Sequence, residues 1–302
     1  MGHYTRIKMS TLVVGASGLV GYEFFRQNKN RGDWYFTYNT HKLRDFIQID
    51  ATNYDEVLNI VNKFKPTTVI LPAALSNVNL CEVERERAYK NNVGVVKNFI
   101  NSLDKSTPKK IVFFSTDYLF DGTEGPCSED VHPNPLNFYG KLKLMCEQEI
   151  ISSQLDYLII RTTLVFGWEM QRKNFLYRVI DTLKDNRELI IPNDQYGNPT
   201  YVKDLIYATQ WLLEKGYHGI YNVVGNEYIN RETFAKKIAL FFGLDQNLVI
   251  GKSTSYFKEV SPRPMLGGLT NDKILKLGIK MKNVEEALSD MQERKFEDDV
   301  YY

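Results

Sequence analysis

The chain has 302 residues, of which 43% are hydrophobic and 25% are charged, so it can bury an ordinary core. Its 38 basic and 37 acidic residues nearly balance, which argues against a dedicated nucleic-acid or membrane-surface binder. Three cysteines, Cys81, Cys127 and Cys146, form neither a disulfide framework nor a metal-ligand pattern. The sequence contains no signal-peptide core and no apolar run of membrane-spanning length, so we expect a cytoplasmic protein.

Strand-like and helix-like segments alternate through the first half of the chain. We expect strands at 10–14, 34–38, 46–49, 68–71, 111–114 and 157–160, and helices at 18–28, 54–64, 81–103 and 135–152. Such alternation predicts a parallel sheet covered by helices on both faces. The fold class is therefore expected to be α/β, with a Rossmann-type doubly wound parallel sheet.

The pattern changes after residue 165. Helices are expected at 174–183, 204–214 and 233–242, and strands at 189–191 and 219–224. We interpret residues 1–165 as the first domain, to which residues 201–225 return. Residues 166–200 and 226–302 then form a smaller mixed α/β domain at the carboxyl-terminal side, which we expect to bind the substrate.

The glycines Gly15, Gly18 and Gly21 follow the first expected strand and open the first expected helix. Glycine lets the backbone turn tightly and approach a pyrophosphate closely. The amino terminus of a helix also offers free N–H groups and a partial positive charge to phosphates. The motif predicts that residues 1–165 are a dinucleotide-binding domain, with Ser17, Leu19 and Val20 among the contacts. The alternative is a glycine-rich turn that binds nothing.

The segment after the second strand, residues 38–44, contains no carboxylate. NAD-binding proteins usually carry an acidic residue here for the ribose 2′-hydroxyl, whereas Asn39, His41 and Lys42 suit a 2′-phosphate. We therefore expect NADP, with NAD as the alternative; a plain basic surface loop would also account for the charges. Further cofactor contacts are expected from Asp50, Ala51, Ala73 and Ala74, which end the third and fourth strands.

The pattern Tyr-x-x-x-Lys occurs three times, as Tyr4/Lys8, Tyr38/Lys42 and Tyr139/Lys143, and only the third copy lies in an expected helix. Residues four apart share one face of a helix, so Lys143 can stand beside Tyr139. Its positive charge would lower the pKa of the Tyr139 phenol toward the working pH. With the glycine motif, this pair predicts hydride transfer; without it, a solvated helix face would be the simpler interpretation.

The chain resembles the extended short-chain dehydrogenases/reductases and, more narrowly, is similar to the dTDP-4-dehydrorhamnose reductases. The resemblance covers nearly the whole length and rests on the glycine motif and on residues 115–122, 133–141, 161–162, 174–175 and 195–200. It implies that Thr116, Tyr139 and Lys143 are catalytic and that Tyr139 and Lys143 also bind the cofactor. Asn92 matches an asparagine of the central helix in that family, which places it in the cofactor site.

The resemblance also implies a set of substrate contacts: Asp117, Tyr118, Leu164, Asn174, Gln195 and Arg263. For Asp117 a turn role is the alternative, and for Arg263 a surface role. Tyr118 stands where the related dehydratases carry a glutamate, which favours simple reduction. Leu164 stands where the rhamnose reductases carry a tryptophan, so the sugar can differ. We expect no metal, since His3, His41, His132 and His218 are scattered.

These observations predict an NADPH-dependent reductase of the 4-keto group of a nucleotide-linked 6-deoxysugar. Two alternatives stay open: a non-catalytic regulatory subunit of the methionine adenosyltransferase type, and a sugar-nucleotide epimerase. The expected partner is a nucleotide-sugar substrate, with neither nucleic acid nor membrane. The resemblance leaves a homodimer as one possible assembly.

Overall fold

The computed structural model describes residues 10–106 and 109–294. Its centre is a seven-stranded sheet in the order β11-β6-β5-β4-β1-β2-β3, and every neighbouring pair in it is parallel. The strands are β1 (Thr11–Val13), β2 (Trp34–Tyr38), β3 (Ile47–Gln48), β4 (Thr68–Leu71), β5 (Lys110–Thr116), β6 (Asp156–Thr162) and β11 (Gly219–Asn222). The inner strands read as apolar runs because a parallel sheet is buried on both faces.

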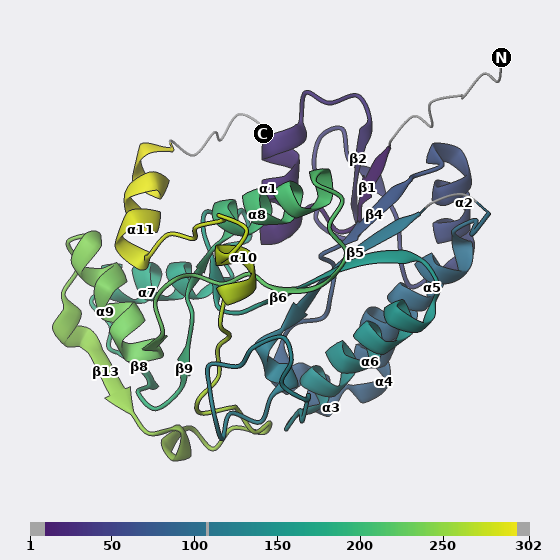
Figure 1. Cartoon of the computed structure of the whole chain (residues 1–302). Coiled ribbons are helices and arrows are strands. Elements are labelled where there is room, and N and C mark those ends of the chain that lie inside the picture. The colour runs from purple at the N-terminus through teal and green to yellow at the C-terminus, as the bar shows by residue number, and fades with distance from the viewer. Residues whose placement is uncertain (1–9, 107–108, 295–302) are drawn as a thin grey trace.

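Helices cover both faces of this sheet, as the alternating pattern predicts. On one side lie α1 (Leu19–Asn28) and α8 (Val202–Glu214), and on the other lie α2 (Tyr54–Phe64), α5 (Val95–Ser102) and α6 (Phe138–Ser152) (Figure 1). Two separate apolar clusters fill the two interfaces, one around Phe24 and Leu205 and one around Phe99 and Leu142. The doubly wound α/β fold is thereby confirmed.

The remaining elements form a smaller region beside the sheet (Figure 1). Its helices are α7 (Phe175–Lys184), α9 (Arg231–Phe241), α10 (Asp272–Leu275) and α11 (Val284–Glu293). Its strands pair in twos: β7 (Val165–Phe166) with β10 (Thr200–Tyr201), β8 (Leu189–Pro192) with β13 (Val249–Lys252), and β9 (Tyr196–Gly197) with β12 (Ile229–Asn230). Strand β11 belongs to the large sheet, and helix α8 packs on one of its faces. The proposed domain boundaries themselves stay a prediction.

Two expected helices differ from the structure. The single helix expected at 81–103 is wrong: the segment contains α3 (Val78–Val83), α4 (Arg85–Tyr89), a π-helical turn η1 (Lys90–Gly94) and α5. The chain leaves helical geometry at Glu84, with φ −108° and ψ 60°. Helix α6 begins at Phe138 rather than near residue 135, because the Asn137 side chain caps it by accepting from the Gly140 N–H at 2.9 Å.

Candidate active site

The glycine motif forms an open cradle between β1 and α1. Gly15 has φ +73°, and a Cβ placed there would lie 2.7 Å from the Cβ of Ala73, so neither its conformation nor its space admits a side chain. A Cβ at Gly21 would lie 2.6 Å from the Cα of Ala16, which lets α1 pack directly on the turn. At Gly18 the nearest atom is 3.7 Å away. The cradle is thus open where the helix amino terminus faces outward, which fits a pyrophosphate.

The residues expected around the cofactor line the same end of the sheet. Ala73 and Ala74 follow β4 and are half-buried. Asp50 is partly committed to the fold, because its Oδ1 accepts from the Thr52 N–H at 2.9 Å and from the Thr52 hydroxyl at 2.7 Å. The main-chain oxygen of Ala51 accepts from the Asn98 amide at 3.0 Å. These contacts stabilise the loop, and the small side chains leave its surface open.

The loop after β2 exposes its polar side chains. Asn39, His41, Lys42 and Arg44 are all exposed, and Nδ1 of His41 lies 2.9 Å from the Thr40 hydroxyl. Within the described part of the chain, neither Lys42 nor Arg44 forms an ion pair. Two cations without carboxylate partners suit a phosphate group better than a free ribose hydroxyl.

The three expected catalytic residues come together at the carboxyl end of β5. Thr116 ends this strand, while Tyr139 and Lys143 lie in the first turns of α6. The Thr116 side chain hydrogen bonds with Tyr139. The ammonium of Lys143 lies 6.0 Å from the Tyr139 ring centroid and donates to the main-chain oxygen of Phe114 at 2.8 Å. The second copy of the pattern is different: Tyr38 is buried in β2 and Lys42 lies in a loop. The first copy, Tyr4/Lys8, and His3 lie outside the described residues.

Burial sets the protonation of this pair. The Tyr139 ring keeps some access to solvent, but burial of its hydroxyl raises the pKa, the charge of Asp117 adds to the rise, and the hydrogen bond with Thr116 opposes it. Burial also lowers the pKa of Lys143. The expected lowering of the Tyr139 pKa by Lys143 is therefore wrong, because burial of the hydroxyl is the largest effect on this pKa and raises it. A phenol that stays protonated is suited to donate a proton.

Several buried polar atoms near this end of the sheet have no hydrogen-bond partner among the described residues. They are Oδ1 of Asn92, Oγ of Ser115, Oγ1 of Thr162 and the hydroxyl of Tyr228. The Asn92 amide itself donates to the main-chain oxygens of Ala88 at 2.9 Å and Leu75 at 3.3 Å, within the π-helical turn. Buried polar atoms are normally paired, so this grouping fits a site that takes a polar ligand.

Tyr118 and Gln195, two of the expected substrate residues, are joined by a third residue that the motifs did not reveal. The Tyr118 ring stands edge-on to Tyr139, with centroids 6.0 Å apart. Arg231, the first residue of α9, donates to the Tyr118 hydroxyl at 3.4 Å and to Oε1 of Gln195 at 2.9 Å. Partial burial of the Arg178 guanidinium on α7 and the like charge of Arg231 lower the pKa of Arg178. Most of the Arg178 side chain is nevertheless exposed. A single arginine in a helix has no recognisable motif, so the sequence did not identify Arg231 or Arg178 as site residues.

The other expected substrate residues are engaged in the fold. Asn174 caps α7 by accepting from the Leu176 N–H at 3.1 Å and donates to the Gly167 oxygen at 3.0 Å. Arg263 pairs with Glu259 at 2.8 Å and donates to Oδ1 of Asn79 at 2.9 Å. Leu164 has φ +44° and packs against Gly197. Asp117 is buried beside Thr116. Direct substrate contacts by these residues stay a prediction.

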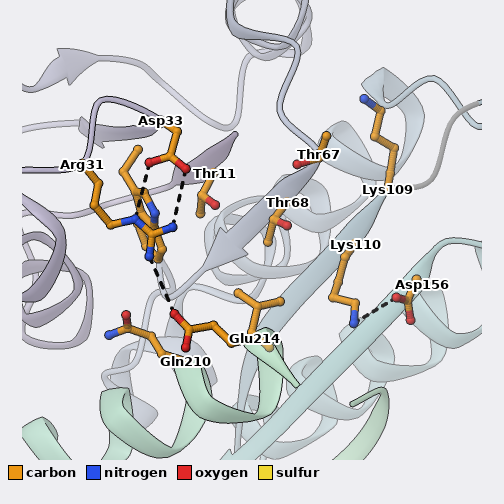
Figure 2. Close-up of a pocket in the computed structure, with 12 residues that line it drawn as sticks. Thr11, Arg31, Asp33, Thr67, Thr68, Lys109, Lys110, Asp156, Gln210 and Glu214 are labelled. Carbon is orange, nitrogen blue, oxygen red and sulfur yellow. Dashed lines mark hydrogen bonds and ion pairs between the residues drawn. The ribbon is translucent and has the colours of Figure 1, made fainter. Parts of the chain in front are cut away.

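A cavity of about 370 Å³ lies at the opposite, amino-terminal end of the strands (Figure 2). Thr11 of β1, Thr68 of β4 and Lys110 of β5 line it. Most of its charged side chains form ion pairs, among them Arg31 with Asp33 at 3.4 Å and Lys110 with Asp156 at 3.0 Å. None of the expected site residues lines this cavity. The candidate site at the carboxyl ends of the strands therefore rests on the residues gathered there and not on the volume of this cavity.

Two kinds of feature are absent from residues 10–106 and 109–294. No helix in these ranges is both long enough and apolar enough to cross a membrane. No group of three or more histidine, cysteine, aspartate or glutamate side chains in them is arranged to hold a metal ion.

Known proteins resemble the chain over nearly its full length. A spore coat polysaccharide biosynthesis protein, SpsK, of Bacillus subtilis is 31% identical over 94% of this chain and 97% of its own. The structure of a dTDP-4-dehydrorhamnose reductase from Clostridium acetobutylicum matches with a TM-score of 0.84 and 31% identity, covering 94% of this chain and 99% of that one. A dTDP-4-dehydrorhamnose reductase from Bacillus anthracis, solved in complex with NADP, matches with a TM-score of 0.83 and 28% identity, covering 96% and 100%.

The two alternative families are represented among more distant matches. Methionine adenosyltransferase 2 subunit beta of Danio rerio is 26% identical over 90% of this chain and 86% of its own. A UDP-glucose 4-epimerase of Thermotoga maritima shares the fold, at 20% identity and a TM-score of 0.81. The family model described as the RmlD substrate binding domain matches residues 9–296. The chain belongs to this family, among whose members are sugar-nucleotide reductases.

Proposed function

We propose that the chain is an NADPH-dependent reductase of the 4-keto group of a nucleotide-linked 6-deoxysugar. The observation that carries the proposal is the grouping of Thr116, Tyr139 and Lys143 at the carboxyl end of β5, on the same edge of the sheet as the glycine cradle. The family membership and the dTDP-4-dehydrorhamnose reductases at about 30% identity support it.

The residues of the chain supply every part of the reduction except the hydride. NADPH, when bound, supplies a hydride to the carbonyl carbon. Tyr139 donates its phenolic proton to the carbonyl oxygen as negative charge develops there, and its raised pKa keeps that proton available. Thr116 turns its hydroxyl proton, which rests on Oδ1 of Asp117 at 3.3 Å, to the same oxygen when the substrate binds. Lys143 uses one N–H on the Phe114 oxygen and keeps two for the nicotinamide ribose. The product is the 4-hydroxyl sugar.

Residues on the two sides of the site would select the two ligands. Lys42 and Arg44, exposed and without ion-pair partners among the described residues, would bind the 2′-phosphate that distinguishes NADPH from NADH. Arg231 lies beside Tyr118, and Arg178 lies near enough to Arg231 for their like charges to interact. A diphosphate would relieve their mutual repulsion, and we assign this region to the diphosphate of the substrate.

The proposal is tested with the purified protein and NADPH against dTDP-, GDP-, UDP- and CDP-linked 4-keto-6-deoxysugars. We expect NADPH oxidation with at least one of them, with product appearing in equal amount. Absence of both turnover and NADPH binding would contradict the proposal. Interconversion of sugars without net NADPH consumption would identify an epimerase instead.

The regulatory-subunit alternative makes a separate prediction. Affinity purification would recover a methionine adenosyltransferase catalytic subunit in equal amount, and the isolated chain would show no reductase turnover. The retention of Thr116, Tyr139 and Lys143 in one group favours catalysis over this alternative. The homodimer and the cytoplasmic location stay predictions.

A further inference from the structure

A segment from the carboxyl-terminal part of the chain crosses the catalytic end of the sheet. We call residues 261–269 the crossing segment; Ser261, Gly267 and Leu269 in it are buried. Its main chain makes specific contacts, because the Gly268 N–H donates to Oδ2 of Asp117 at 3.0 Å and the Leu269 N–H donates to Oδ1 of Asn198 at 2.9 Å. The segment also carries Arg263, whose guanidinium lies 6.0 Å from the centroid of the Tyr118 ring.

The same segment is tied to the catalytic helix. Nδ2 of Asn137 donates to the Pro262 oxygen at 2.9 Å, while Oδ1 of this residue caps α6 at Gly140. Tyr139 lies in the turn that this cap closes. One side chain therefore fixes both the crossing segment and the start of the helix that carries the proton donor.

Asp117 makes the matching connection on β5. Its Oδ1 accepts from the Thr116 hydroxyl at 3.3 Å, and the Thr163 hydroxyl also hydrogen bonds to this carboxyl group. The side chain is 3% exposed. A Cβ at Gly267 would lie 3.0 Å from Oδ2, so the crossing segment closes directly over the carboxyl group. Both oxygens are thus occupied by protein donors, which leaves little room for a substrate contact.

Burial also makes the ionised carboxylate unfavourable here and raises the pKa of Asp117. The hydrogen bonds from Gly268, Thr163 and Thr116 and the positive charge of Arg231 oppose that rise. A buried acid whose oxygens only accept hydrogen bonds can be replaced by an amide of the same shape. A residue that gives a proton to the substrate cannot be replaced in this way.

We propose that Asp117 is a positioning residue, which accepts hydrogen bonds from the Gly268 amide and, before the substrate binds, from the Thr116 hydroxyl. It thereby couples the crossing segment to the residue that then turns its proton to the carbonyl oxygen. The proposal rests on the function proposed above. It gives Asp117 no contact with the sugar. Docking of the crossing segment then aligns Thr116 through Asp117, and Tyr139 through Asn137.

The test compares Asp117→Asn with Asp117→Ala, and uses Asp130→Asn as the matched control because Asp130 is exposed on the neighbouring loop. Steady-state kcat and KM, the affinity for NADPH, and amide hydrogen exchange at Gly268 by NMR are measured. We expect Asp117→Ala to lower kcat by about 100-fold through misalignment, with NADPH affinity unchanged. The Gly268 amide should exchange faster in this variant, because its acceptor is gone.

Asp117→Asn should recover most of the activity, to within about fivefold of the unchanged protein, because its amide oxygen still accepts from Gly268 and hydroxyls can accept from its N–H. The Gly268 amide should stay protected. The proposal is overturned if Asp117→Asn is as inactive as Asp117→Ala while Gly268 stays protected, because the acid itself would then be needed.

Normal kcat and normal protection of Gly268 in Asp117→Ala would overturn it equally. Should Asp117→Ala not fold, Asp117→Asn and the Gly268 exchange decide the question. Failure of the unchanged protein to turn over any sugar nucleotide would count against the proposed function alone, since hydrogen exchange at Gly268 tests the tether without a substrate.

Discussion

The carboxyl ends of the central strands, called here the carboxyl edge, and their amino ends, the amino edge, differ in the surroundings of their charged side chains. At the carboxyl edge, Asp117 and Lys143 are only 3% and 4% exposed, and neither has a carboxylate or cation in direct contact within the described structure. At the amino edge, Lys110 and Asp156 form an ion pair at 3.0 Å (Figure 2), and the Asp156 side chain is 49% exposed to solvent. At the carboxyl end, burial thus shifts the pKa values of Asp117 and Lys143, whereas at the amino end Lys110 and Asp156 pair close to solvent.

Topology explains the difference. In a parallel sheet the carboxyl ends of the strands meet the amino termini of the following helices, and the loops diverge there to admit a ligand. In this protein the crossing segment and α6 then cover that edge and remove water from its polar groups. The amino edge has a cavity of about 370 Å³, but the described residues that line it include no buried charge without a partner. Perturbed ionisation, and not volume, marks the candidate site.

The largest effect on activity is expected at the carboxyl edge from Tyr139→Phe. Loss of the general acid should lower kcat by about 1,000-fold. NADPH affinity should change little, because the ring remains. Tyr207→Phe is the matched control, since Tyr207 is 58% exposed on α8. Activity that survives Tyr139→Phe undiminished would remove the catalytic assignment.

The next comparison concerns stability. Arg161 and Glu147 pair at 2.7 Å with side chains 4% and 1% exposed, whereas the Lys110–Asp156 pair is partly in water. Glu147→Ala should lower the free energy of unfolding by about 3 kcal/mol, because it leaves a buried guanidinium unpaired. Asp156→Ala should lower it by less than about 1 kcal/mol. Urea unfolding of both variants measures the difference, and equal losses would show that burial does not set the contribution of these two ion pairs to stability.

A smaller effect is expected in cofactor choice. The double variant Lys42→Ala/Arg44→Ala should weaken NADPH binding about tenfold, which corresponds to roughly 1.4 kcal/mol. Binding of NADH should be unchanged, because it lacks the 2′-phosphate. Calorimetric titration with both cofactors separates the two. Equal weakening for both would show that the loop does not read the phosphate.

The pH dependence should report Lys143. Burial lowers the pKa of Lys143, so it loses its positive charge at a lower pH than an ordinary lysine, while the raised pKa of Tyr139 keeps the phenol protonated. An unperturbed lysine has a pKa of about 10.4. We expect kcat/KM for reduction to fall at a lower pH than this, as the pH rises through the lowered pKa of Lys143. A profile that stays flat beyond that pH would argue against the buried ammonium.

The smallest effect is expected at the amino edge. Gln210→Trp would fill part of the cavity there, and Gln210 lies on α8, far in the chain from the catalytic group. We expect kcat and KM to stay within about twofold of the unchanged protein, as for ordinary surface substitutions. A large loss would mean that the amino edge communicates with the site.

The local pattern of the sequence was sufficient for the fold class and for the outline of the site. Strand and helix periodicities predicted the doubly wound sheet, and the spacing of Gly15, Gly18 and Gly21 predicted the turn between β1 and α1. The four-residue spacing of Tyr139 and Lys143 predicted one helix face. These features depend on neighbours within a few residues, which a sequence displays directly.

Other features depend on residues distant in the chain, and only the tertiary structure decided them. Glu84 interrupts the expected helix, Arg231 reaches Tyr118 from 113 positions away, and Gly268 reaches Asp117 from 151 positions away. The pKa of Tyr139 rises instead of falling for the same reason. Its value depends on how much water the surrounding elements exclude, and desolvation is a property of packing that residue spacing does not encode.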